Sequence, residues 1–238
     1  MMKIVSGPIG SRSIDDYLKV IYKIEADEEV PTTGRIAALL ELSPASVTGM
    51  LRRLSTHDPP LVDYEKHRGA TLTGAGRLRA LETLRHHRLI ELFLHKVLGF
   101  GWDEVHEEAE NLEHVISETL EDRIAERLGH PTVDPHGDPI PAKDGSLPEL
   151  GDVALISVYP GAAGVVSRVK DGEREVFRYL GGIGLVPGAE VTVVGRGPFD
   201  GPVTVRTANG EEHALGRNLA SKVYLYPGKA QDDDPDAP

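Results

Sequence analysis

The 238-residue chain contains no cysteine. That absence excludes disulfide bonds, thiolate zinc sites and iron–sulfur clusters, so any bound metal must be held by oxygen and imidazole ligands. Aromatic residues make up only 5 % of the chain, and no apolar run approaches the roughly 20 residues of a membrane-spanning helix. Residues 1–12 lack the apolar core of a signal peptide. We therefore expect a cytoplasmic protein with no membrane partner.

The net charge of −12 is unevenly distributed along the chain. Residues 1–77 balance ten Lys and Arg against ten Asp and Glu, whereas residues 78–150 hold seven against sixteen, and the remainder holds nine against twelve. A globally acidic chain does not coat nucleic acid nonspecifically, but a locally neutral or basic module can still bind DNA. The acidic excess falls in the middle segment, where histidines also cluster.

The most informative stretch runs from His106 to His114, within what we predict to be one acidic helix from Trp102 to about Gly129. At about 100° per residue, His106, Glu110, Glu113 and Ser117 share one stripe, and His114 lies at its edge. A neighbouring apolar stripe is formed by Val105, Ala109, Leu112, Ile116 and Leu120. Carboxylates at the margin of a buried face are costly to desolvate, and a divalent cation would offset that cost. The alternative is a solvated acidic face, and the stripe alone leaves both interpretations open.

The first 77 residues have the pattern of a winged helix-turn-helix. Helical spacing predicts helices over residues 13–26 and 34–40, the second capped by Thr32 or Thr33, and a third helix with Ser43 as N-cap and Pro44 in its first turn. Two short strands, 61–65 and 70–73, would form the wing. The alternative is a structural helical hairpin in an enzyme, but the basic tip at residues 66–69 argues against it.

The third helix begins with small and polar residues, which would let it enter the major groove of DNA without steric conflict. Basic side chains near its end and on the wing could reach phosphates. We expect DNA contacts from Ser43, Pro44, Ser46, Thr48, Arg52, Arg53, Lys66 and Arg68.

Beyond the wing, a long helix from Thr73 to about Leu98 carries His87 and Glu91 on one face. After a proline-rich linker the pattern changes to six or seven short strands, which suggests a small barrel. The fold class we predict is a mainly α N-terminal half followed by a small all-β barrel. We expect a winged helix over 1–77, a helical metal-binding and dimerisation domain over 78–130, a linker over 131–150, the β-domain over 151–227 and a disordered tail over 228–238.

Eight motifs are spread along the chain from about Ser13 to Tyr226. They are Asp16-Tyr-Leu-Lys-Val-Ile-Tyr22, Ser43-Pro-Ala-Ser-Val-Thr48, Leu72-Thr-x-x-Gly76, His87-Arg-Leu-Ile-Glu91, Val105-His-Glu-Glu-Ala-Glu-Asn-Leu-Glu-His114, Asp134-Pro-His-Gly-Asp-Pro-Ile-Pro141, Leu180-Gly-Gly-Ile-Gly-Leu-Val-Pro-Gly188 and Gly201-Pro-Val. Together they resemble the diphtheria-toxin-repressor family of metal-dependent repressors, and more closely its manganese-responsive branch. The C-terminal motifs resemble the SH3-like domain shared with ferrous-iron transport accessory proteins.

The resemblance implies two metal sites per subunit. The positions that match its primary site are Asp16, Glu110, Glu113 and His114, and those that match its ancillary site are His87, Glu91 and His106, with Glu173 or Glu175 as a further carboxylate.

This chain departs from the family at four positions. Iron-responsive members have sulfur ligands where this chain has Asp16 and Glu110; hard oxygen ligands favour Mn²⁺ in relative terms, although Fe²⁺ tolerates them. Shorter manganese sensors have a carboxylate where this chain has Lys19, which argues against a closely spaced binuclear site. Gly49 replaces a base-reading Gln, so the operator sequence cannot be inferred.

We therefore expect a homodimeric, Mn²⁺-activated regulator that binds palindromic operator DNA, represses manganese uptake genes and has no small-molecule substrate. The nearest alternative is the same fold sensing Fe²⁺. A metallohydrolase using the His/Glu cluster is a second alternative, but no catalytic metal motif is present and the winged helix would be unexplained. A third is a metal-storage or protein-interaction role for the SH3-like domain, which could instead bind Pro139–Pro141 internally.

Overall fold

The computed structural model describes residues 9–170 and 173–228, so all of the predicted tail except Gly228 lies outside the described residues. Contacts divide the chain into two compact units. The first comprises Met1–Ile90, Glu110–Arg127 and Ile140–Leu147, and the second comprises Glu91–Ala109, Leu128–Pro139 and Pro148–Pro238. Each unit is described by itself.

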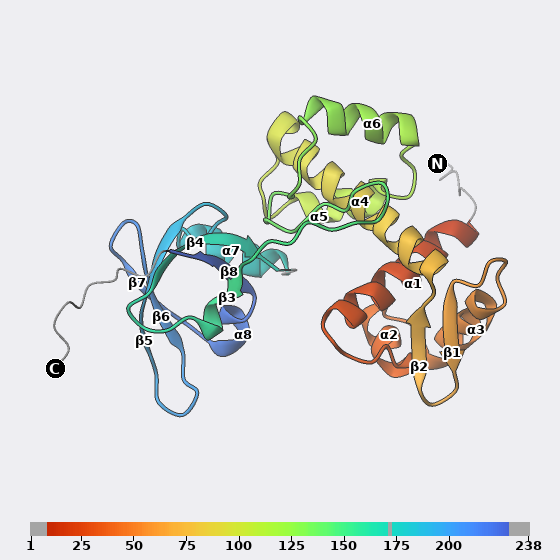
Figure 1. The fold of residues 1–238 in the computed structure, drawn as a ribbon, viewed down its shortest axis with the longest axis horizontal. Coiled ribbons are helices and arrows are strands. Elements are labelled where there is room, and N and C mark those ends of the chain that lie inside the picture. The colour runs from red at the N-terminus through yellow and green to blue at the C-terminus, as the bar shows by residue number, and fades with distance from the viewer. Residues whose placement is uncertain (1–8, 171–172, 229–238) are drawn as a thin grey trace, which may run out of the picture. The chain divides into compact units, whose positions relative to one another are not determined.

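The predicted winged helix is present in the first unit (Figure 1). It consists of α1 (Ile9–Ala26), α2 (Thr33–Leu39), α3 (Pro44–Ser55) and the antiparallel strands β1 (Val62–Glu65) and β2 (Gly69–Leu72). Thr32 caps α2 by accepting a hydrogen bond from the Arg35 amide at 3.2 Å, and Ser43 caps α3 by accepting one from the Ser46 amide at 3.2 Å. The core of this part includes Leu18, Ile21, Ile36, Leu51 and Leu54, all fully buried.

Gly69, the first residue of β2, lies where the wing contacts the backbone just before α2. Its φ is 104°, and a Cβ atom there would come within 2.7 Å of the Pro31 carbonyl oxygen, so only glycine fits this close approach without strain. The wing is thereby held against the start of α2, where the Ala70 amide donates to the same Pro31 oxygen at 3.0 Å.

After α4 (Gly74–Leu98), the single acidic helix that we predicted is wrong: the structure has α5 (Val105–Leu112) and α6 (Glu118–Arg127) instead. The reason is that a second helix begins within this acidic segment, at Glu118. The Ser117 hydroxyl accepts a hydrogen bond from the Leu120 amide at 3.3 Å, and Glu118 and Glu121 lie in the first turn of α6, where the helix dipole favours acidic residues. Glu113 and His114 therefore lie in the turn between two helices.

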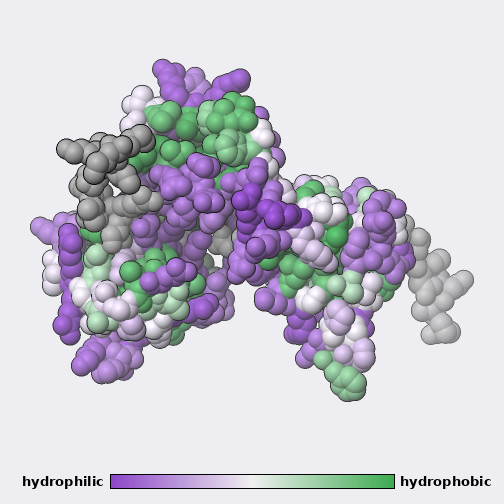
Figure 2. Space-filling model, turned by 180° about the vertical axis from the view of Figure 1, so that it is seen from behind, coloured by the Kyte–Doolittle hydropathy of each residue, from purple (hydrophilic) through white to green (hydrophobic). Residues whose placement is uncertain are grey.

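The predicted apolar stripe is also only half right. Val105 and Ala109 are buried, but Leu112 and Leu120 are 38 % and 48 % exposed, and the neighbouring Val115, outside the predicted stripe, is 74 % exposed. Figure 2 shows hydrophobic side chains gathered on the surface over α4–α6. An exposed group of apolar side chains of this kind is typical of a protein–protein contact surface.

The second unit contains a six-stranded antiparallel sheet in the order β3-β8-β4-β5-β6-β7, which confirms the predicted β-domain. Two helices that the sequence pattern did not predict, α7 and α8, accompany it, and Phe177 and Leu180 of α7 are buried in its core. The elements are β3 (Val153–Ala154), the 3₁₀ turn η1 (Leu155–Ser157), β4 (Ala163–Val169), α7 (Arg174–Gly182), β5 (Glu190–Arg196), β6 (Val203–Thr207), β7 (Glu212–Leu215), α8 (Arg217–Ala220) and β8 (Val223–Pro227).

Residues 136–138 of the linker contact β4, just before Pro139–Pro141, the segment that one of the alternative interpretations binds to this domain. The Val169 amide donates to the His136 carbonyl oxygen at 2.8 Å, and Arg168 Nη1 donates to Asp138 Oδ1 at 3.2 Å. Among the described residues no helix is both long enough and apolar enough to cross a membrane.

Candidate metal centres and DNA-contact surface

The first cluster joins Asp16 of α1 to Glu113 and His114 of the α5–α6 turn. The Nε2 atom of His114 lies 2.8 Å from Asp16 Oδ1 and 3.2 Å from Glu113 Oε1, and its side chain is only 3 % exposed. Despite these short distances, neither ring nitrogen of His114 has hydrogen-bond geometry to a partner. A buried imidazole that faces two carboxylates without hydrogen-bonding them fits a divalent cation, because such an ion would satisfy all three ligands.

Glu113 is the centre of this cluster, and its side chain is fully buried. Its Oε1 accepts a hydrogen bond from Lys19 Nζ at 2.5 Å, and its Oε2 lies 2.5 Å from His87 Nδ1. Lys19 Nζ also donates to Glu110 Oε1 at 2.8 Å. The structure thus brings together Asp16, Glu113 and His114, whereas Glu110 is held beside them through Lys19. His87, which we expected in the ancillary site, contacts Glu113, which we expected in the primary site.

A second cluster consists of Glu91, Asp134 and His136, all of them buried, with one ligand atom from each lying within 4.8 Å of the others. Glu91 Oε1 lies 3.1 Å from Nδ1 of His106, which we also predicted for the ancillary site. Glu91 Oε2 lies 3.8 Å from Nδ1 of His136, whose Nε2 donates to the Trp102 carbonyl oxygen at 2.7 Å.

Sequence reasoning missed Asp134 and His136. Burial alone would lower the pKa of His136, but the Glu91 carboxylate outweighs it and raises the pKa to about 9. The signal in the sequence was two metal-ligating side chains two residues apart in the linker. We had interpreted those residues only as a linker motif.

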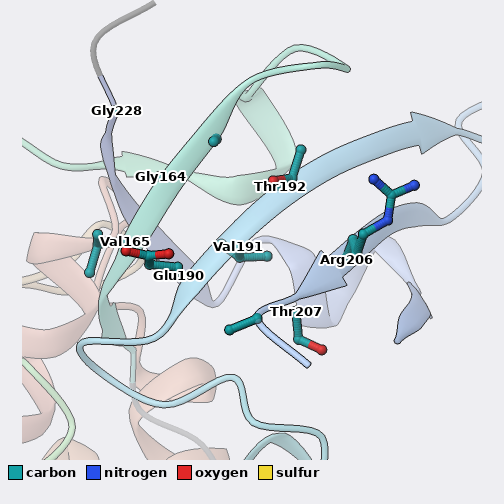
Figure 3. A pocket seen from close by; sticks show the side chains of 10 residues that line it. Gly164, Val165, Glu190, Val191, Thr192, Arg206, Thr207 and Gly228 are labelled. Carbon is teal, nitrogen blue, oxygen red and sulfur yellow. The ribbon is translucent and has the colours of Figure 1, made fainter. Parts of the chain in front are cut away.

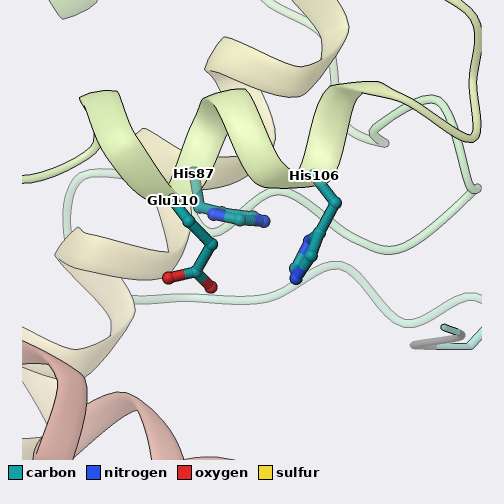
Figure 4. A group of neighbouring side chains, drawn as sticks. All are labelled: His87, His106 and Glu110. Atoms are coloured by element: carbon teal, nitrogen blue, oxygen red, sulfur yellow. The ribbon is translucent and has the colours of Figure 1, made fainter. Parts of the chain in front are cut away.

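The other predicted ancillary residues are placed by their helices. Figure 4 shows His87 projecting from α4, and His106 and Glu110 projecting from the same side of α5, one turn apart. Glu173 precedes the first turn of α7 and Glu175 lies within it. Neither belongs to a group of metal-ligating side chains formed by the described residues, so their role stays a prediction.

A further group, Glu82, His86 and Glu118, has the features of an ion-pair network. His86 Nε2 lies 3.2 Å from Glu121 Oε2, but Arg85 Nε already donates to Glu121 at 2.6 Å. Lys143 Nζ likewise lies 3.6 Å from Glu118. Burial and the nearby Glu118 carboxylate raise the pKa of Glu82. Resident cations therefore already pair with Glu118 and Glu121.

The residues predicted to contact DNA lie on the surface of the winged helix. A groove of about 300 Å³ runs between the start of α2, Thr48 of α3 and Lys66 of the wing. Arg52 and Arg53 lie exposed in the last turn of α3, and Arg68, also exposed, pairs with Glu65 at 3.1 Å. Ser43, Pro44 and Ser46 form the exposed start of the same helix.

The β-sheet carries a separate groove of about 370 Å³ along β4, β5 and β6 (Figure 3). Small side chains line most of it, and its charged lining residues are Glu190 and Arg206. Because Arg206 pairs with Glu212 at 2.7 Å, this groove lacks the converging polar groups of a ligand site.

A winged helix whose first helix contributes to a cluster of carboxylates and imidazole is the architecture expected of a metal-responsive DNA-binding protein. Three successive segments of the chain match known protein families, and these matches agree with this architecture. Residues 11–70 match the iron dependent repressor N-terminal DNA binding domain, residues 73–142 match the iron dependent repressor metal binding and dimerisation domain, and residues 153–227 match the FeoA domain.

Individual proteins show the same similarity. The chain is 36 % identical to the iron-dependent repressor IdeR of Mycobacterium tuberculosis (strain ATCC 25618 / H37Rv), over 88 % of this chain and 94 % of that protein. It matches the structure of a manganese-dependent transcriptional repressor complex with manganese, with a TM-score of 0.81 and 37 % identity over 90 % of this chain and 100 % of that one. The structure of the manganese regulator SloR gives a TM-score of 0.76 and 32 % identity over 90 % and 98 % of the two chains.

The chain belongs to the iron-dependent repressor family, which includes the diphtheria toxin repressors. It is a metal-dependent DNA-binding transcriptional repressor and not an enzyme, as the sequence predicted. The relatives include proteins named for iron and proteins named for manganese, so the comparisons support a divalent metal without selecting one.

Proposed function

We propose that this repressor is activated by Mn²⁺ and that Asp16, Glu110, Glu113 and His114 form its primary metal site. The observation that supports this is the ligand chemistry: the described first cluster offers carboxylate oxygens and imidazole, with no sulfur atom within it. Hard oxygen ligands favour Mn²⁺ relative to Fe²⁺ and Co²⁺ when compared with sites that contain sulfur. The ion would supply positive charge that draws these carboxylates and the imidazole together.

The cluster also supports a mechanism for activation. Asp16 lies on α1 of the winged helix, whereas Glu113 and His114 lie in the turn that precedes α6. Ligation by all three would fix the orientation of the DNA-reading module. Metal and DNA then favour the same conformer, and each tightens binding of the other by the same factor.

The proposed assembly is a homodimer on a palindromic operator. The exposed residues Leu112, Val115 and Leu120 provide apolar area for a contact between two copies, within the segment that matches a dimerisation domain. A two-fold dimer presents two recognition helices to half-sites that are related by the same symmetry. We keep the division into a DNA-binding module over 1–77, a helical domain over 78–130, a linker over 131–150 and a β-domain over 151–227. A repressor of this kind would act on chromosomal DNA in the cytoplasm.

A second metal site would be formed around Glu91. We propose that Glu91 and His106, which already lie 3.1 Å apart, share it with the buried residues Asp134 and His136. His87 and a carboxylate from Glu173 or Glu175 remain proposed contributors. Glu91, His106, Asp134 and His136 all belong to the second unit, which also contains the β-domain, so occupancy of this site would fix the part of the linker that carries Asp134 and His136.

The test begins by selecting the operator from random-sequence DNA with purified protein and Mn²⁺. Binding to the selected DNA is then measured against free Mn²⁺ in a metal buffer. Mn²⁺-dependent enrichment of a palindrome, and its loss with a chelator, would support the proposal. Equal enrichment with and without the metal would contradict it. Activation by Fe²⁺ alone would favour the alternative of an iron-responsive repressor, to which the 36 % identity with IdeR also points.

A further inference from the structure

Lys19 is a buried cation in the first metal cluster. Its side chain is 6 % exposed, and its Nζ atom lies 2.8 Å from Glu110 Oε1 and 2.5 Å from Glu113 Oε1. A lysine is rarely buried unless it is paired, and here it bridges two carboxylates proposed as ligands of the same metal ion.

The ammonium group and the imidazole of His114 approach the same carboxylate oxygen. Glu113 Oε1 lies 2.5 Å from Lys19 Nζ and 3.2 Å from His114 Nε2. In two-metal sites a shared carboxylate joins ions that lie about 3.5–4 Å apart. Lys19 Nζ therefore stands where a second ion would bind, while Asp16 and His114 face the position of the first.

The charges in the cluster also indicate that it holds one divalent ion and not two. Asp16, Glu110 and Glu113 carry three negative charges, and Lys19 carries one positive charge. Asp15, the neighbouring carboxylate, is already paired with Arg79 at 2.6 Å. One divalent ion makes the cluster neutral, whereas a second would leave two uncompensated positive charges in a buried place, which is costly.

We propose that Lys19 is a tethered cation that takes the place of a second metal ion and limits this cluster to one divalent ion per chain. The inference rests on the proposed primary metal site and adds its stoichiometry. It also predicts the effect of reversing the charge. With Lys19→Glu the cluster carries four negative charges, which two divalent ions neutralise.

The experiment compares full-length wild-type protein with Lys19→Glu after removal of metal with a chelator. Bound Mn²⁺ is counted by equilibrium dialysis, and electron paramagnetic resonance reports whether two ions are magnetically coupled. We expect one more Mn²⁺ per chain in the variant, with a coupled signal that the wild type lacks. The matched control is Lys96→Glu, the same charge change at an exposed position near the end of α4, which should leave both readings unchanged.

Lys19→Met is the second variant, because an apolar side chain of similar length suits a buried position. Glu113 keeps its contact with His87, so loss of the neighbouring positive charge should tighten the first Mn²⁺ by about tenfold or more. An unchanged ion count in folded Lys19→Glu, a coupled pair in the wild type, or unchanged or weaker binding in Lys19→Met would overturn the inference.

His114→Ala separates this inference from the proposed function. It should remove one Mn²⁺ per chain from the wild-type count. If the count does not fall, the primary site itself is wrong, whatever the Lys19 variants show.

Discussion

His114 Nε2 lies 2.8 Å from Asp16 Oδ1, although these residues belong to the turn before α6 and to the first helix of the winged helix. This contact links the DNA-reading module to the segment that matches a metal binding and dimerisation domain. Because the imidazole has no hydrogen-bond partner there, a cation would strengthen the link rather than replace an existing bond.

Removing one ligand should abolish the response to metal while leaving the protein folded. We expect Glu110→Ala and His114→Ala to weaken Mn²⁺ binding by more than the 10–100-fold typical of an outer-shell partner, because each removes a direct ligand. Metal titration of DNA binding checks this, and size-exclusion chromatography checks the dimer. Glu108→Ala, an exposed carboxylate on the same helix as Glu110, is the control and should behave as the wild type. Retained Mn²⁺-stimulated binding in both ligand variants would refute the assignment.

Ligand softness should set the metal preference. Asp16→Met places a thioether beside His114, and soft ligands favour Fe²⁺ and Co²⁺ over Mn²⁺ more strongly than carboxylates do. The ratio of half-activating Fe²⁺ to Mn²⁺ concentrations should fall in the variant, as measured by DNA binding under anaerobic conditions. If the metal ranking does not change, Asp16 is not a ligand.

The wing should bind the DNA backbone. Replacing exposed Lys66 and Arg68 with Ala should weaken binding to operator and random DNA alike and flatten the salt dependence by about one unit per lost phosphate contact. Fluorescence anisotropy over a range of salt concentrations measures both effects. Lys96→Ala, distant in sequence from the winged helix, should leave the slope unchanged. Loss of sequence discrimination with an unaltered slope would contradict a backbone role.

His136 should make the stability of the metal-free protein depend on pH. Its pKa is raised from 6.5 to about 9 chiefly by Glu91, so its charged form stabilises the fold below pH 6.5, and this stabilisation is lost as the pH rises through 9. The shift corresponds to on the order of 3 kcal/mol in the free energy of unfolding. The destabilisation caused by His136→Phe, measured by urea unfolding with a chelator, should therefore be smaller at pH 10 than at pH 6 by about that amount. His67→Asn on the exposed wing tip is the control and should show no such pH dependence. If His136→Phe lowers the free energy of unfolding equally at pH 6 and pH 10, the ion pair with Glu91 is excluded.

The sequence predicts the winged helix well because its signals are local. Thr32, Ser43 and Pro44 mark helix starts by their own chemistry, and all three lie where we expected. The break between α5 and α6 was also a local signal, the Ser117 cap, but the acidic periodicity on both sides concealed it.

Two features of the candidate sites depend on packing and could not be predicted. His136 stacks on Phe177 of α7, with ring centroids 4.1 Å apart, and its Nδ1 lies 3.8 Å from Glu91 Oε2. Lys19 was recognised as a departure from a family pattern, but its bridge between Glu110 and Glu113 depends on contacts between helices far apart in the sequence.

The central claim is that Mn²⁺ occupancy of the first cluster switches on DNA binding. The most direct measurement is binding of the selected operator, titrated in parallel with free Mn²⁺, Fe²⁺ and Zn²⁺, with metal occupancy recorded on the same samples. We predict that operator binding rises to saturation with Mn²⁺ and that its midpoint coincides with filling of the site lost in His114→Ala. Saturating Mn²⁺ that fills this site but leaves operator binding at the level of the chelator-treated protein would contradict the account.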